Sequence, residues 1–142
     1  VAIVAVLAAA ALPLVEIGAR RHKELELRES LREIRASLDK YKKAYDEGHI
    51  ARRTNESGYP PTLQALVDGV EDAKSATKKR IYFMRRLPRD PFSHEPVSSA
   101  AETWSKRSYA SAPDAPQEGE DVFDVYSRSR ETGLNGVPYR NW

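Results

Sequence analysis

The feature that most limits the fold is an uncharged apolar segment at the start of the chain, residues 1–15. Its sequence is VAIVAVLAAAALPLV, and Glu16 and a highly charged run follow it directly. A helix of this length reaches roughly 22 Å, short of the ~30 Å hydrocarbon layer of a bilayer. Because it is apolar on every side, it also needs more cover than the polar remainder can give. We therefore expect residues 1–15 to be the membrane or assembly part of a longer helix, with further residues before Val1.

A signal peptide and a buried core helix are the two other interpretations of this segment. A signal peptide has a flanking basic region and a cleavage site, whereas here the helical pattern continues past Val15. Pro13 removes a backbone donor and crowds the carbonyl of Ala9, so we expect a kink near Pro13. The kink is either merely tolerated or a feature of close helix packing, to which the alanines at 8–11 are suited.

Beyond Glu16 the pattern becomes that of an amphipathic helix. Apolar residues recur at spacings of three and four. They are Leu27, Leu31, Ile34, Leu38, Tyr41 and Tyr45. Gly48 is a suitable stop, so we expect one long helix over residues 1–47 and a separate head over residues 48–142.

Charges on this helix nearly balance, and several have the four-residue spacing of ion pairs. Such pairs are Glu16 with Arg20, Glu24 with Arg28, and Asp39 with Lys43. They form either a solvated surface or a surface that meets neighbouring copies of the chain. In the second case the residues expected at the interface between copies are Val4, Leu7, Leu12, Pro13, Leu14, Glu16, Arg20, Glu24 and Arg28.

The rest of the chain predicts a small α+β head. Thr62 is a good cap for a short helix over residues 63–67, and residues 68–79 are expected to form a turn and a weak helix. Two strands are expected within TWSKRSYAS and DVFDVYSRS, with a loop rich in Pro and Gly between them. The expected architecture is a long helix packed on a head with a short helix and an antiparallel sheet.

Composition excludes several kinds of chemistry. The chain has no cysteine, so it forms no disulfide and has no thiolate nucleophile or Cys-based zinc site. Its net charge is only +2, which argues against a nucleic-acid partner.

No catalytic site is expected, and we predict that the chain is not an enzyme. Asp90 is expected to be a turn former. Trp104 and Trp142 are either packing residues or a ligand platform. The histidines are expected at the surface without ligand spacing: His22, His49 and His94.

Four segments in order resemble type IV pilin-like proteins, most closely the major pseudopilin of type II secretion systems. VAIVAVLAAAALP is similar to the family's helix beyond its processing site, and GYPPTLQAL to the stretch after that helix. RLPRDPF resembles a Leu-Pro-x-Asp-Pro-Trp motif with Phe92 in place of the tryptophan. FDVYSRSRETG is similar to the segment before the family's C-terminal loop.

The resemblance implies a structural subunit of a filament. Members of the family carry a leader that a prepilin peptidase removes, and their mature helix starts with a methylated Phe and a buried Glu, neither of which is in this sequence. They wait in the bacterial inner membrane with the head in the periplasm. They then assemble with identical subunits, minor pseudopilins and an inner-membrane assembly platform. The alternatives are a type IV pilin for adhesion or motility and a singly anchored periplasmic binding domain.

The family's C-terminal loop commonly binds calcium, and this chain departs from that pattern. Arg130 stands where a liganding aspartate is expected, and Glu131 and Asn135 are the main oxygen ligands left nearby. A calcium ion takes about six to eight oxygens. We therefore expect no metal or other cofactor. Arg130 is either a substitute for the ion's positive charge or an exposed side chain on a mobile loop.

Overall fold

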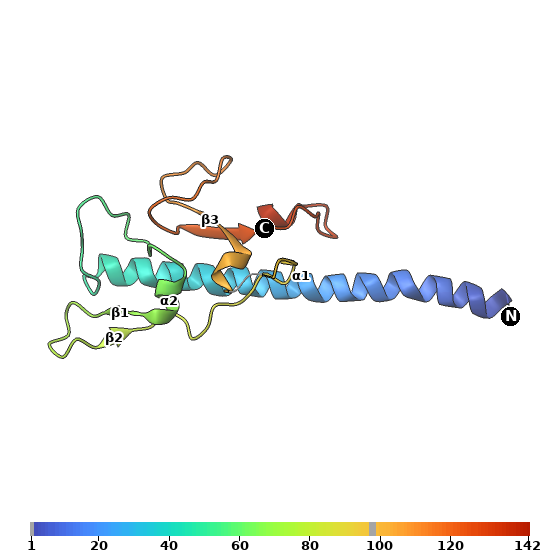
Figure 1. Cartoon of the computed structure of the whole chain (residues 1–142), viewed down its shortest axis with the longest axis horizontal. Helices are drawn as coiled ribbons and strands as arrows, with labels where there is room; N and C mark the ends of the chain where they lie inside the picture. The colour runs from blue at the N-terminus through green and yellow to red at the C-terminus, as the bar shows by residue number, and fades with distance from the viewer. Residues whose placement is uncertain (1, 97–98) are drawn as a thin grey trace.

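One long helix dominates the protein, which is described as a computed structural model over residues 2–96 and 99–142, without the side chains of Ala10 and Leu12. Helix α1 (Ala2–Asp46) has 45 residues. Its N-terminal part projects as a bare rod beyond the rest of the molecule (Figure 1). The helix ends where Gly48 adopts a φ of 81°, a left-handed conformation that glycine tolerates. The predicted stop at this glycine is confirmed.

Pro13 lies inside α1, and the helix continues through it. In Figure 1 the ribbon curves gently in this region and is not broken. A proline at this position removes one hydrogen bond of the helix, but the flanking turns on either side keep the rod continuous.

The C-terminal half of α1 is the centre of the hydrophobic core. The stripe predicted from the sequence is buried, since Leu27, Ile34 and Leu38 are at most 1% exposed. The side chains that cover it come from the whole remainder of the chain. The largest of them are Leu63, Leu66, Phe83, Met84, Leu87, Phe92, Trp104, Val125 and Tyr139.

The first part of the head contains a short helix and a hairpin. Helix α2 (Gln64–Asp68) follows Thr62, whose Oγ1 accepts a hydrogen bond from the Ala65 amide at 3.2 Å, as expected of a cap. Strand β1 (Val70–Glu71) pairs antiparallel with β2 (Arg80–Ile81). The weak helix predicted over residues 68–79 is therefore wrong, because these residues form the hairpin and its connecting turns.

The second part of the head contains another antiparallel pair. The 3₁₀-helix η1 (Ala101–Thr103) leads into β3 (Trp104–Arg107), which pairs with β4 (Asp124–Ser127), Trp104 facing Ser127 in the register. Both strands were predicted, but they are shorter than the expected segments. A last 3₁₀-helix, η2 (Tyr139–Asn141), closes the chain onto the core.

The two sheets lie on opposite sides of α1. Figure 1 shows β1 and β2 on one side of the helix and β3, with the loop that follows it, on the other. The long helix, the short helix and two small antiparallel sheets form the predicted α+β layout, which fits a pilin-like fold. Because α1 fills the space between the sheets, its second half and residues 48–142 share one core.

Candidate functional site

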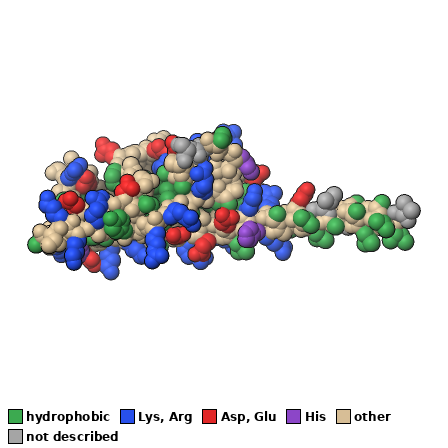
Figure 2. All heavy atoms as spheres, turned by 60° about the horizontal axis from the view of Figure 1, so that its bottom comes forward, with side chains coloured by type: hydrophobic (Ala, Val, Ile, Leu, Met, Phe, Trp, Pro, Cys, Tyr) green, Lys and Arg blue, Asp and Glu red, His purple; other side chains and the backbone are tan. Residues whose placement is uncertain are grey.

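The first candidate site is the projecting start of α1, residues 2–15, here called the apolar arm. Val4, Leu7 and Leu14 are 65–69% exposed, and Pro13 is exposed as well. Figure 2 shows hydrophobic side chains along the arm beyond the head. By length and composition, α1 includes an 18-residue window near its N-terminus, longer than residues 2–15 alone, that could cross a membrane; signal sequences pass the same test. Leu12, also predicted at an interface, has a side chain outside the described residues.

Exposure of this kind is unfavourable in water. Each large aliphatic side chain left in water forgoes about 1.5–3 kcal/mol of burial. Contiguous exposed apolar surface is typical of a site that contacts another protein or a membrane. The head therefore leaves the apolar surface of the arm uncovered.

The second candidate site is the junction where α1 enters the head. Here three residues, Arg20, Glu24 and Tyr139, form a hydrogen-bond chain. The Arg20 Nε donates to the Tyr139 hydroxyl at 3.0 Å, and that hydroxyl donates to Glu24 Oε1 at 2.8 Å. Tyr139 is fully buried and Glu24 is 8% exposed. Burial raises the pKa of the Tyr139 phenol, and the hydrogen bond to Tyr139 raises the pKa of Arg20.

Two residues of this hydrogen-bond chain, Arg20 and Glu24, also hold the C-terminal loop, residues 128–137, against the helix. Glu24 Oε1 also accepts from the Leu134 amide at 2.8 Å, and Arg20 Nη2 donates to the Thr132 carbonyl at 2.6 Å. The ion pairs expected along the helix are not the contacts that these residues make among the described residues. Arg20 and Glu24 bind their own head, Arg28 lies over Trp142, Lys43 lies 3.8 Å from Glu47, and Glu16 is exposed.

Two of the oxygens that a calcium ion in the loop could use already accept hydrogen bonds within the chain. The Thr132 carbonyl accepts from Arg20, and the Asn135 side-chain oxygen accepts from the Val137 amide at 3.0 Å. Arg130 and Glu131 are both exposed. Among the described residues no group of three or more His, Cys, Asp or Glu side chains could hold a metal ion. The guanidinium that contacts a loop carbonyl is that of Arg20, where the sequence suggested Arg130.

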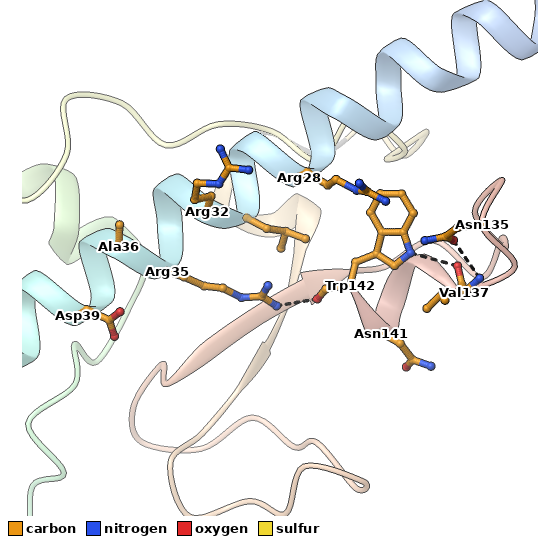
Figure 3. A pocket seen from close by; sticks show the side chains of 10 residues that line it. Arg28, Arg32, Arg35, Ala36, Asp39, Asn135, Val137, Asn141 and Trp142 are labelled. Atoms are coloured by element: carbon orange, nitrogen blue, oxygen red, sulfur yellow. Dashed lines mark hydrogen bonds between the residues drawn. The ribbon is translucent and has the colours of Figure 1, made fainter.

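A shallow groove beside the junction is the third candidate (Figure 3). The Arg28 guanidinium lies 4.4 Å from the centre of the Trp142 ring, a cation–π contact. Arg35 donates to the Trp142 carbonyl at 2.8 Å and to Asp124 at 2.8 Å. Trp142 therefore acts as a packing residue that ties the chain's last residues to α1.

The remaining candidates from the sequence have structural roles or exposed positions. Asp90 accepts from the Phe92 amide at 2.9 Å and from Ser127 Oγ at 2.6 Å, so the turn former is confirmed. His22 and His94 are exposed. His49 is not a plain surface residue, because its Nδ1 lies 2.9 Å from Asp72 Oδ1 and its side chain is 34% exposed.

Sequence reasoning missed Tyr139 and Arg35. Tyr139 is 115 positions from Glu24 and Arg35 is 89 from Asp124. No local spacing links residues so far apart, and the one available signal was that Tyr139 is a large aromatic residue, three positions before Trp142.

Comparison of the chain with protein-family models, with curated proteins and with solved structures finds no match. The function is therefore argued from the arm, the junction and the head themselves.

Proposed function

We propose that this chain is a structural subunit that polymerises through its apolar arm into the pseudopilus of a type II secretion system. The observation that carries the proposal is the arm itself, with Val4 and Leu7 exposed at the end of a helix whose other half is a packed core. A prepilin peptidase would process the chain, and minor pseudopilins and an inner-membrane platform would assemble it with identical subunits. The head would lie in the periplasm.

The mechanism is physical. Before assembly, acyl chains solvate the arm in the inner membrane. During assembly the arm leaves the lipid and packs against the arms of identical subunits. The alanines at 8–11 favour close approach of helices in such an environment. A head-to-tail contact that does not close into a ring then produces a helical filament.

The junction supports this role because it makes the rod and the head move together. Arg20 and Glu24 bind the last segment of the head to the helix just where the arm emerges. A pull on the arm is therefore transmitted to the head through hydrogen bonds and through the core around Leu27.

Electron microscopy of cells that overexpress the full-length chain together with a type II assembly system tests the proposal. We expect filaments that an antibody against the head labels along their length. A variant with Val4→Asp and Leu7→Asp should give no filaments while its head keeps the same melting temperature.

The other candidate is a singly anchored binding domain, which the groove beside Trp142 favours. It predicts a membrane-bound monomer under the same conditions. Labelled filaments would exclude it, and a monomer at every expression level would exclude the pseudopilin.

A further inference from the structure

Charges in the head are segregated along the sequence. Residues 73–89 include no Asp or Glu, and they carry Lys74, Lys78, Lys79, Arg80, Arg85, Arg86 and Arg89. Residues 108–127 include no Lys or Arg, and they carry Asp114, Glu118, Glu120, Asp121 and Asp124. A net charge of only +2 for the whole chain therefore conceals two oppositely charged segments.

The two segments lie on opposite sides of α1. Residues 72–79, which begin with Asp72, connect β1 to β2, and residues 108–123 connect β3 to β4. Figure 1 places the β1–β2 hairpin on one side of the helix and the loop after β3 on the other. Figure 2, in which the hairpin side comes forward, shows Lys and Arg side chains spread over the head.

Some of these charges already act within the chain. Arg80 donates to the carbonyls of Asp68 and Gly69. Asp121 accepts from Ser57 and from the Tyr109 amide, and Asp124 pairs with Arg35.

The exposed charges that remain define two surfaces. The basic face consists of Lys78, Lys79, Arg85 and Arg86, with the exposed Lys74 and Glu71 nearby on the hairpin. The acidic face consists of Asp114, Glu118 and Glu120. The partly buried Lys106 lies beside Glu118, and Arg107 and Arg140 line one pocket with Asp114.

We infer that the basic face of one copy of this chain docks on the acidic face of the next, as the contact between heads in the proposed filament. The two faces lie on opposite sides of α1 and carry charges of opposite sign. In a head-to-tail arrangement the basic face of one copy meets the acidic face of the next, whereas in a head-to-head arrangement two faces of like charge meet and repel. A nucleic-acid partner would instead need a one-sided basic excess over the whole chain. The inference rests on the proposed function and adds to it the two surfaces through which neighbouring heads contact each other.

Crosslinking tests the contact directly, because the chain has no cysteine of its own. The full-length chain with Lys79→Cys and Glu118→Cys, in cells that assemble filaments, is treated with a short bifunctional thiol reagent. We expect a ladder of covalent oligomers. Each single-cysteine variant should give no ladder, since a head-to-tail contact never brings two identical positions together.

Charge reversal in this double-cysteine background tests the electrostatic cause. Arg85→Glu with Arg86→Glu should lower the ladder yield about tenfold, as should Asp114→Lys with Glu120→Lys, because like charges then face each other. Combining both pairs should restore the yield. The matched control for the Arg85 and Arg86 reversal is Lys23→Glu with Lys40→Glu, which makes the same change in net charge at exposed positions of α1 outside both faces and should leave the yield unchanged. Raising the salt from about 0.05 M to about 0.5 M should weaken the wild-type contact.

The outcomes separate the two proposals. Filaments without a ladder, or reversal variants that crosslink as well as the parent, would overturn the docking inference and leave the pseudopilin proposal standing. A ladder without filaments would support the docking contact and contradict the pseudopilin proposal.

Discussion

The two halves of helix α1 are continuous in backbone and opposite in environment. In the apolar arm, Val4 and Leu7 are exposed. In the second half of the helix, Leu27 and Ile34 are completely buried. Both halves form helix, so helix formation does not decide burial. What differs is the pattern: the arm is apolar on all sides, and the second half confines its apolar residues to one stripe. An element apolar on all sides has no polar face to turn toward water, so part of its apolar surface stays exposed unless something outside the head covers it.

The largest difference between the two halves should appear in membrane binding, when acidic residues are introduced into the apolar arm. Val4→Asp with Leu7→Asp should release the full-length chain from membranes, because each acid costs about 2.5–3.5 kcal/mol near the centre of a span. Flotation of membranes through a density gradient measures the bound fraction. Leu25 is 66% exposed on the head half of the same helix, and Leu25→Asp should leave the bound fraction unchanged. Equal release by both variants would remove the distinction.

The next effect belongs to the head half. Ile34→Ala should destabilise the head by about 2–5 kcal/mol, because it leaves a cavity in a fully buried site. Leu25→Ala should change the stability by less than about 0.5 kcal/mol. Urea unfolding of the full-length chain in detergent, followed by tryptophan fluorescence, compares the two. Membrane binding should be the same for both variants, and a release by Ile34→Ala would contradict the division of roles.

The junction between the halves should show an intermediate effect. Glu24→Gln weakens two hydrogen bonds to Tyr139 and Leu134, and we expect a loss of about 1–3 kcal/mol together with faster proteolysis of the C-terminal loop. Glu26 is exposed two positions away and provides the matched control as Glu26→Gln. Limited proteolysis followed by mass spectrometry locates the cuts. Identical digestion of the two variants would show that Glu24 does not hold the loop.

A smaller effect should appear with pH at the far end of the helix. The hydrogen bond from His49 lowers the pKa of Asp72 below its ordinary value of about 3.9. A lowered folded pKa stabilises the head above pH ~4, and this contribution is lost as the pH falls through the folded pKa. Asp72→Asn should therefore lower the melting temperature at pH 7, and the difference should disappear once the pH has fallen below the folded pKa of Asp72. Asp114→Asn, at an exposed acid, should show no such trend.

The smallest expected effect is that of calcium. Since Arg20 occupies the Thr132 carbonyl of the C-terminal loop, we expect calcium at about 1 mM to leave the melting temperature of the head unchanged, although a site of extracellular affinity would be filled at that level. Magnesium at the same concentration serves as the control. A saturable rise with calcium alone would show that the loop binds the ion after all.

Sequence periodicity was sufficient where an element is long and its neighbours are near in the chain. The stripe from Leu27 to Tyr41 and the stop at Gly48 were both predicted, because side chains three and four positions apart share a helix face. Strands β3 and β4 were recognised from their alternation, although their ends were not. The hairpin of β1 and β2 was missed, because two-residue strands are too short for any pattern to emerge.

The apolar arm and the amphipathic half of α1 were thus determined by the sequence alone, because hydrophobic pattern and helical geometry are local properties. Only the tertiary structure decided that Arg20, and not Arg130, binds the C-terminal loop, that Glu24 faces its own head, and that the charged segments lie on opposite sides of the rod. The physical reason is that these contacts join residues far apart in the chain, whose meeting depends on how the whole core packs.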